Sequence, residues 1–245
     1  MQVLLFLHRL YFFVILNIRN KKTYKMKKII FLFIISSLIS IKGIGLTLSP
    51  ETEVSILTCA PGNELYSLFG HTAIRINDPR HQIDRVYNYG TFDFSTPHFY
   101  LKYARGLLPY QLTVQKFSHF IYNYQLEERT VYAQTIRLDS LEKQRVFDLL
   151  EENLLPQNRY YLYNFLFDNC TTRSRDILLK SLPDSVAWNM PDVNKNFWNL
   201  LDEYLQASPW VQWGIHTILG QRGNRTATTF QYMFLPDYLM YGLKN

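Results

Sequence analysis

The sequence has little cysteine: Cys59 and Cys170 are its only two thiols. They are far apart in the chain and no His-Glu-x-x-His pattern occurs, so the sequence predicts no dedicated zinc site. A glycine-rich loop that could cradle phosphate is missing, and so is the Gly-x-Ser-x-Gly elbow of serine hydrolases. We therefore expect neither a metal nor another cofactor, and nucleophilic chemistry would fall to one of the two cysteines.

The sequence also lacks a basic excess outside its first 43 residues. The chain of 245 residues has a formal charge of +6, but residues 1–43 hold eight Lys and Arg residues and no acidic one. The remainder has 18 basic against 20 acidic residues and is slightly acidic. A nucleic-acid backbone is held by a basic surface, so we exclude nucleic acid as a partner.

The first 43 residues have the features of a targeting segment. Met26-Lys27-Lys28 precedes a short apolar run, Ile29 to Ile35, and then a serine-containing stretch, which is the layout of a secretory signal peptide. The run is short for a membrane span, whereas Lys42-Gly43 is a poor cleavage site, so a signal peptide and an N-terminal anchor both stay open for residues 26–43. We interpret residues 1–25 as a spurious extension and expect the protein to be exported.

Residues 44–245 contain no Gly/Ser linker and no internal repeat, which favours a single domain with its own core. Alternating apolar runs indicate strands early in the chain, and helical periodicity dominates later. The sequence thus predicts one α+β domain, an antiparallel sheet with helices packed against it. The expected strands include 53–59, 70–76, 83–89, 110–115 and 129–138; the expected helices include a turn or two at 63–69, one capped at Asp139, and 170–182, 194–206 and 209–219.

Two of these strands, 70–76 and 83–89, form a predicted hairpin around the turn residues Asn77 to Arg80. If the turn is centred on its Pro-Arg pair, Arg75 lies opposite Asp84, and the two opposite charges share one face of the sheet. We prefer this register to one shifted by a single residue, since it also gives the histidine that begins the first strand an amide neighbour.

His71 is the histidine best placed to act as a base. It follows a glycine at the start of a strand, where its side chain can face a cleft, whereas the other five histidines lie in the leader, a turn, or aromatic and helical surroundings. A catalytic imidazole also needs a group that holds its ring in one tautomer. The hairpin register makes Asn88 the first candidate for that role and Tyr89 the second. A purely structural role for His71, as a hydrogen-bonded residue without a part in catalysis, stays open.

Cys170 opens a predicted helix that follows the aromatic run 160–167. The unsatisfied N–H groups at a helix start carry partial positive charge, which favours the thiolate, the form that attacks carbonyl carbon. Asp168 or Asn169 is suited to cap this helix. The residues alone leave two other roles open for Cys170: a buried structural thiol or, in an exported protein, one half of a disulfide with Cys59.

Longer motifs carry a resemblance to a known family. They are Leu57 to Arg75 with its Gly-His-Thr step, Tyr87 to Phe94, Asp168 to Arg173 with its Asn-Cys step, and Met233 to Leu239. Over residues 50–240 the chain resembles the DUF4105 family, which includes the N-terminal periplasmic domain of Lnb-type lipoprotein N-acyltransferases. The order of an early strand histidine and a late helix cysteine is also similar to that of circularly permuted papain-like proteins, such as lecithin–retinol acyltransferase and permuted NlpC/P60 proteins.

The resemblance implies a permuted papain-like (NlpC/P60-type) fold and acyl transfer in the periplasm. In that interpretation Cys170 attacks a fatty-acyl ester and forms a thioester, His71 shuttles protons, and the acyl group passes to the amino group of a lipoprotein's N-terminal cysteine. Asn169 and Thr171 at the helix start would cap the helix and help to hold the oxyanion. The implied partners are a phospholipid or a lipidated protein and a membrane surface; the 18 tyrosines and 17 phenylalanines suit a lipid-facing surface or an ordinary core.

Two other functions stay open. A hydrolase, such as an amidase or peptidase acting on cell-wall peptides, would use the same pair of His71 and Cys170 with water in place of the amine. A noncatalytic periplasmic binding module would instead join Cys59 and Cys170 in a disulfide. Lnb-type proteins continue into transmembrane helices whereas this chain stops at Asn245, so both a shortened protein and a domain that works on its own are compatible with the resemblance.

Overall fold

The structure is a computed structural model that describes residues 45–93, 95–98, 102, 107–182, 188, 190 and 194–244. Leu48 to Asn245 forms one compact unit. The expected leader, residues 1–25 and 26–43, lies outside the described residues.

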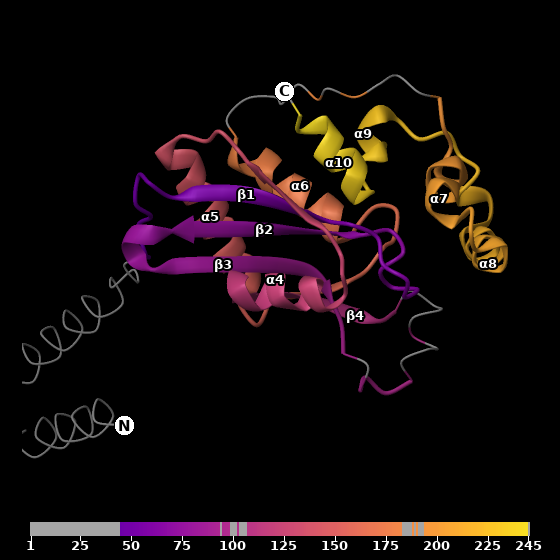
Figure 1. The fold of residues 1–245 in the computed structure, drawn as a ribbon, viewed down its shortest axis with the longest axis horizontal. Helices are drawn as coiled ribbons and strands as arrows, with labels where there is room; N and C mark the ends of the chain where they lie inside the picture. The colour runs from indigo at the N-terminus through magenta and orange to yellow at the C-terminus, as the bar shows by residue number, and fades with distance from the viewer. Residues whose placement is uncertain are drawn as a thin grey trace, which may run out of the picture. The chain divides into compact units, whose positions relative to one another are not determined.

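An antiparallel sheet of six strands forms the centre of the described chain (Figure 1). The strands lie in the order β5-β1-β2-β3-β4-β6, so the chain meanders from β1 to β4 and the two later strands extend opposite edges. This confirms the expected antiparallel sheet. The strands are β1 (Glu53–Cys59), β2 (His71–Asp78), β3 (Ile83–Thr91), β4 (Pro109–Lys116), β5 (Val131–Thr135) and β6 (Tyr160–Leu162).

Helices cover both faces of this sheet, which confirms the α+β class. One face carries α5, α6 and α10, and the other carries α4. The described helices are α4 (Phe117–Leu126), α5 (Ser140–Leu154), α6 (Cys170–Ser181), α7 (Phe197–Leu205), α8 (Pro209–Leu219), α9 (Thr229–Tyr232) and α10 (Pro236–Gly242), with the 3-10 turns η1 (Pro79–His81) and η2 (Gly220–Arg222).

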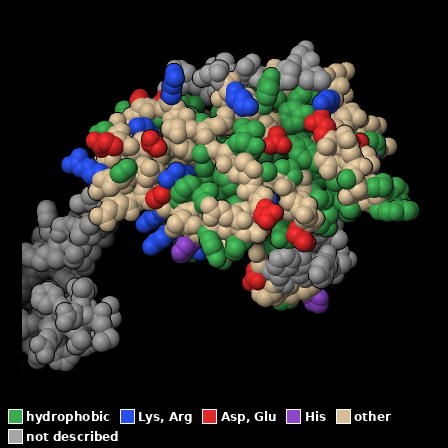
Figure 2. Space-filling model, in the orientation of Figure 1, with side chains coloured by type: hydrophobic (Ala, Val, Ile, Leu, Met, Phe, Trp, Pro, Cys, Tyr) green, Lys and Arg blue, Asp and Glu red, His purple; other side chains and the backbone are tan. Residues whose placement is uncertain are grey.

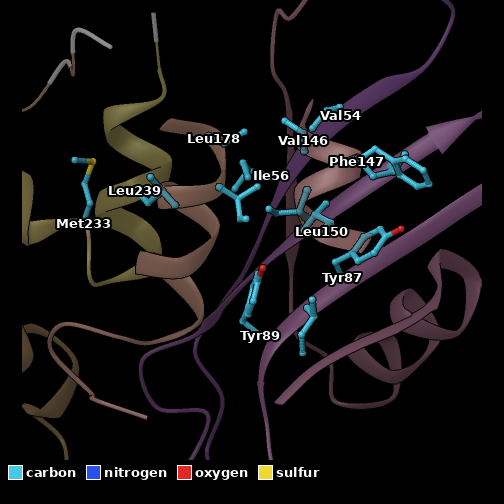
Figure 3. Close-up of a cluster of buried hydrophobic side chains, with 14 residues drawn as sticks. Val54, Ile56, Tyr87, Tyr89, Val146, Phe147, Leu150, Leu178, Met233 and Leu239 are labelled. Atoms are coloured by element: carbon cyan, nitrogen blue, oxygen red, sulfur yellow. The ribbon is translucent and has the colours of Figure 1, made fainter. Parts of the chain in front are cut away.

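The main core lies between the sheet and the pair α5 and α6 (Figure 3). Every second residue of β1 and β2 points to it, as Ile56 and Ile74 do, because side chains alternate between the two faces of a strand. They meet Val146 and Leu150 of α5 and Ile177 of α6, all almost fully buried. Burial of each such aliphatic side chain contributes roughly 1.5–3 kcal/mol, so this layer holds α6 firmly against the sheet.

The opposite face of the sheet is also buried. Leu57 and Cys59 of β1, Ala73 of β2 and Val86 of β3 pack with Phe120 of α4. β1 is covered on both faces, and from Val54 to Cys59 each of its residues is buried.

Capping residues set the helix bounds. Asp139 caps α5 in a capping box with Glu142, as the sequence predicts. The α8 bounds also agree with the expected 209–219, whereas α7 begins only at Phe197 because Asn196 is its N-cap. The helical turns expected at 63–69 are wrong, since this segment forms hydrogen-bonded turns without a helix.

The hairpin register differs from the expected one by two residues. Arg75 lies opposite Val86 and not opposite Asp84, because η1 and the left-handed Gln82 (φ 55°) give the connection four residues in place of two. A two-residue shift keeps every side chain on its original face. Arg75 therefore still reaches Asp84 diagonally and donates two hydrogen bonds, at 2.7 and 2.9 Å, to its carboxylate.

A second core, here called the C-terminal cluster, is built on α7. It consists of Phe197, Leu200, Leu201, Leu205, Ala227, Tyr232, Phe234, Leu235 and Leu166. Partly buried side chains pack against it from the loops that lead to β2 and α6, among them Phe69 and Phe165, which contact each other edge to face. The cluster thus joins the helical end of the chain to the two loops that precede His71 and Cys170.

Candidate active site

Cys170 is the first residue of α6, and its position is fixed by the cap that precedes it. Oδ1 of Asn169 accepts hydrogen bonds from the N–H groups of Thr171 and Thr172, both at 2.9 Å. The amide nitrogen of the Asn169 side chain donates to the carbonyls of Phe165 and Phe234, at 2.8 and 2.9 Å. Both the oxygen and the nitrogen of the Asn169 side-chain amide are therefore hydrogen-bonded, and the helix start cannot move without breaking these bonds.

His71 is the first residue of β2, and the glycine before it allows this placement. Gly70 has a φ of +74°, and a Cβ at this position would lie 2.5 Å from the carbonyl oxygen of Cys59. Only glycine tolerates both the left-handed conformation and this close approach. The chain therefore turns sharply against the end of β1 and sets the imidazole at the end of the sheet where β2 begins.

The structure brings His71 and Cys170 together, although they are 99 positions apart in the chain. Burial by itself would raise the pKa of the Cys170 thiol, but the charge and hydrogen bond of His71 outweigh it, and the pKa is lowered. Burial would likewise lower the pKa of His71, whereas the charge and hydrogen bond of Cys170 and the hydrogen bond of Asn88 raise it. Both shifts favour a thiolate beside an imidazolium, the form in which a cysteine attacks an acyl carbon.

Asn88 of β3 lies within hydrogen-bond distance of the histidine. Its Oδ1 lies 3.3 Å from Nε2 of His71. An amide oxygen can only accept, so Nε2 carries the proton in this contact and Nδ1 is the ring nitrogen that remains free to exchange a proton. The preferred sequence candidate for this position is thus in contact with the imidazole.

Tyr89, the second candidate, does not contact His71. Its side chain points to the opposite face of the sheet and is buried in the main core (Figure 3). There its hydroxyl accepts a hydrogen bond of 2.9 Å from the side chain of Asn153. The physical reason is the alternation of the strand, which sends residues 88 and 89 to opposite faces.

The expected oxyanion role of Thr171 also needs correction. Its N–H group is already used by the side chain of Asn169, and its hydroxyl lies 3.1 Å from the hydroxyl of Thr72. The N–H of Cys170 itself is the helix-start donor that this cap leaves unused. The backbone of Thr72 additionally hydrogen-bonds the Cys170 sulfur and lowers the thiol pKa, so β2 supports the thiolate as well as α6.

Cys59 and Cys170 are both free, so the disulfide of the binding-module hypothesis is wrong. Cys59 is buried at the end of β1 among the side chains that face α4. Burial raises the pKa of its thiol to about 12, which a hydrogen bond with Tyr124 only partly opposes. Cys59 is therefore a protonated core thiol at neutral pH, in contrast to Cys170, which is partly exposed.

Tyr161 of β6 is a neighbour of the site that the sequence analysis missed. A Cβ at Gly90 would lie 3.5 Å from Cβ of Cys170 and 4.0 Å from the hydroxyl of Tyr161, so both side chains lie against Gly90. The hydroxyl is buried and, apart from an interaction with the backbone of Gly90, meets no hydrogen-bond partner among the described residues. The guanidinium of Arg173 lies 3.5 Å from the ring centroid and braces it.

A bulge in the sheet opens room for this arrangement. The β3–β4 register shifts between Asn88 and Thr91, and Gly90, inside the shift, has a φ of +87°. Bulges of this kind re-aim side chains at the rim of a sheet. Here the bulge brings the backbone of β3 close to Cys170, since a Cβ at Gly90 would lie 3.5 Å from Cβ of Cys170.

Two further findings concern the described residues alone. They contain no group of three His, Cys, Asp or Glu side chains that could hold a metal ion. None of the helices within them has the length and apolar character needed to span a bilayer.

Comparison with known proteins gives one match. A family model described as the Lnb N-terminal periplasmic domain matches residues 47–201, which is more than half of the chain. The matched segment includes His71, Asn88 and Cys170. No curated protein and no solved structure matches the chain.

Proposed function

The chain belongs to the family of Lnb N-terminal periplasmic domains, and on this premise we propose that it is an exported cysteine acyltransferase. Cys170 would take a fatty acyl group from a phospholipid ester and pass it to the N-terminal amino group of a lipoprotein. The observation that carries the proposal is the pairing of Cys170 with His71 at the start of α6, which favours the thiolate.

The first half-reaction forms a thioester. The thiolate of Cys170 attacks the ester carbonyl carbon, and the carbonyl electron pair moves onto oxygen. The N–H of Cys170, at the positive end of α6, is the donor best placed to hold this oxyanion. As the oxyanion collapses, the carbon–oxygen bond to the leaving alcohol breaks, and the alkoxide takes a proton from the imidazolium of His71.

The second half-reaction uses the now neutral His71 as a base. The amino nitrogen of the acceptor attacks the thioester carbonyl, and His71 accepts a proton from that nitrogen. The carbon–sulfur bond then breaks, an amide forms, and the site returns to thiolate and imidazolium. Asn88 holds the imidazole in one tautomer through both steps by its contact with Nε2.

The same arrangement supports the finer fold assignment. A histidine on an early strand and a cysteine at the start of a later helix, packed against one antiparallel sheet, have the chain order of a permuted papain-like domain. We therefore include this fold in the proposal. A capped α6 that packs on both the sheet and its neighbour α5 gives the rigid support that a preorganised nucleophile needs.

The test is intact-mass spectrometry of the full chain after incubation with a phospholipid that carries an isotopically labelled acyl group. We expect a labelled acyl adduct on Cys170, none with Cys170→Ser, and a strongly reduced amount with His71→Ala. Cys59→Ser is the matched control and should keep the adduct, because its thiol is buried and protonated. Absence of the adduct in the wild-type protein would sink the proposal.

A peptide acceptor separates transfer from hydrolysis. When a synthetic peptide with a diacylated N-terminal cysteine is added, the label should leave Cys170 and appear as an amide on the peptide. Release of the label as free fatty acid, at a rate that the peptide does not change, would instead assign the site to a hydrolase.

A further inference from the structure

Helix α8 leaves an apolar face uncovered at the surface. Trp210, Trp213 and Ile218 are 84%, 67% and 73% exposed, and no residue of the helix is fully buried. Figure 1 shows α7 and α8 beyond the end of the sheet at which β1 ends and β2 begins, and Figure 2 shows hydrophobic side chains at the corresponding edge of the molecule. Two tryptophans this exposed on one helix are a feature that the fold itself does not need.

The other side of α8 explains how the helix is held. Val211, Ile215 and Leu219, spaced by four residues, pack on the C-terminal cluster. His216 is tied to Asp202 of α7 at 2.8 Å and stacks on Trp198. The inward side is therefore anchored to α7, and the outward face is presented on a fixed support.

The segment that contains this face carries no acidic residue, and the neighbouring Asp202 is paired with His216. Between Glu203 and Asp237 the sequence contains no Asp or Glu, and α8 itself contains no Lys or Arg either. Arg222 and Arg225, in and just after η2, are exposed and form no ion pair with the described residues. The face thus combines tryptophan rings with two free cations that follow the helix.

We propose that the α8 face, made of Trp210, Trp213, Ile218, Arg222 and Arg225, docks on the surface of an anionic lipid bilayer. Tryptophan rings settle at the headgroup level of a bilayer, where an apolar body and a polar N–H are both accommodated. The exposed arginines that follow the helix would attract anionic headgroups. With its other side anchored to α7, α8 would lie along the plane of the interface and present its tryptophans to the headgroups.

Docking at α8 would also bring the candidate site to its substrate. The C-terminal cluster on which α8 rests includes side chains from the loops before His71 and Cys170. The site would then lie near the headgroups, where the ester bonds of phospholipids are. This last step rests on the proposed function, whereas the docking does not.

The test is quenching of tryptophan fluorescence by brominated lipids in vesicles of phosphatidylglycerol and phosphatidylcholine, with the full chain. Of the four tryptophans, Trp210 and Trp213 are the exposed pair on α8. We expect strong quenching in the wild-type protein and its loss in the double variant Trp210→Ser, Trp213→Ser. That variant should also bind vesicles less tightly by roughly tenfold or more. Leu141→Ser on α5, also 67% exposed, is the matched control and should change neither result.

The contribution of the two arginines to vesicle binding is tested separately. Arg222→Gln and Arg225→Gln should each weaken binding to phosphatidylglycerol vesicles by roughly fivefold, since one cation near an anionic surface is worth about that much. Arg137→Gln, exposed on another part of the chain, should have no effect. Quenching of equal strength in vesicles of phosphatidylcholine alone would overturn the anionic preference.

Three outcomes would overturn the docking. They are absence of quenching in the wild-type protein, quenching that survives the double tryptophan variant, and a dimer that the same variant converts to monomer, which would assign the face to a second copy of the chain. Cys170→Ser should quench like the wild type. An inactive site with normal quenching would thus refute the proposed function and leave the docking intact.

Discussion

Nε2 of His71 lies 3.3 Å from Oδ1 of Asn88 although the two residues are not opposite each other in the sheet. The β2–β3 register pairs Ile74 with Tyr87, and its extension sets His71 opposite Gly90, which makes Asn88 the diagonal neighbour. Diagonal residues on one face lie within reach of long or aromatic side chains. The contact fixes the imidazole between an amide acceptor on one side and the sulfur of Cys170 on the other.

Asn88→Ala should slow acylation by about 10- to 100-fold, the effect of losing a hydrogen bond to a charged group. Since this bond raises the pKa of His71, its loss should also move the alkaline limb of the pH–rate profile to lower pH. Asn88→Asp, which places a negative charge at the same position, should move that limb to higher pH. As a control, Asn123→Ala, exposed on α4, should change neither the acylation rate nor the alkaline limb of the pH–rate profile. If the alkaline limb stays in place in both Asn88 variants, the contact with His71 is not functional.

The thiolate of Cys170 should be detectable without any substrate. Because its pKa is lowered, the rate of alkylation by iodoacetamide should reach its plateau at a lower pH than for a free cysteine. In His71→Ala the lowering charge is gone while burial remains, so the pKa should rise above its ordinary value and alkylation at neutral pH should slow. Peptide mapping would measure this, with Cys59 unmodified in the same sample as internal control. An identical pH profile in His71→Ala would contradict the assignment of the pair.

Tyr161→Phe should separate stability from catalysis. Removal of a buried hydroxyl with no partner beyond the Gly90 backbone should leave the free energy of unfolding unchanged or slightly higher. If the hydroxyl donates to the acyl oxyanion, acylation should fall by about 10²-fold while iodoacetamide alkylation of Cys170 keeps its rate. Tyr132→Phe, half exposed on β5, is the control. Unchanged acylation would limit Tyr161 to packing beneath Arg173.

Gly70→Ala should disturb the site through the backbone. A methyl group there would lie 2.5 Å from the carbonyl oxygen of Cys59 in a left-handed conformation, so we expect a loss of stability of about 2 kcal/mol or more. The imidazole should also be displaced, with slower alkylation of Cys170. Gly214→Ala in α8, where nothing lies within 4 Å, should be neutral or stabilising in urea denaturation. Equal stability of the two variants would show that the chain can enter β2 without the left-handed glycine at position 70.

The bounds of several helices and strands could be predicted from the sequence, because they depend on residues that are close together in the chain. Asp139 and Asn169 have side chains that cap a helix, and both do so. Proline at position 209 sets the start of α8. The apolar pattern of β1 was sufficient to give its bounds, since the strand is buried on both faces.

The sequence could not distinguish the tyrosines of the aromatic run. Tyr160 and Tyr161 have the same chemistry, and their facing depends on the β4–β6 pairing of Tyr110 with Tyr161. That pairing is a contact between segments about 50 positions apart, which no local pattern encodes. The hydroxyl beside Cys170 was missed for this reason.

What the sequence by itself determined is the chemistry available: one helix-start thiol, one strand histidine behind a glycine, and an amide on the neighbouring strand. What only the tertiary structure decided is which of these meet. The length of the turn after Asp78 shifted the register by two residues, and because strand side chains alternate with a period of two, Asn88 stayed on the face of His71 while Tyr89 went to the core. The packing of α6 against β2 then brought Cys170 to the same end of the sheet, a contact across 99 positions that depends on the burial of both cores.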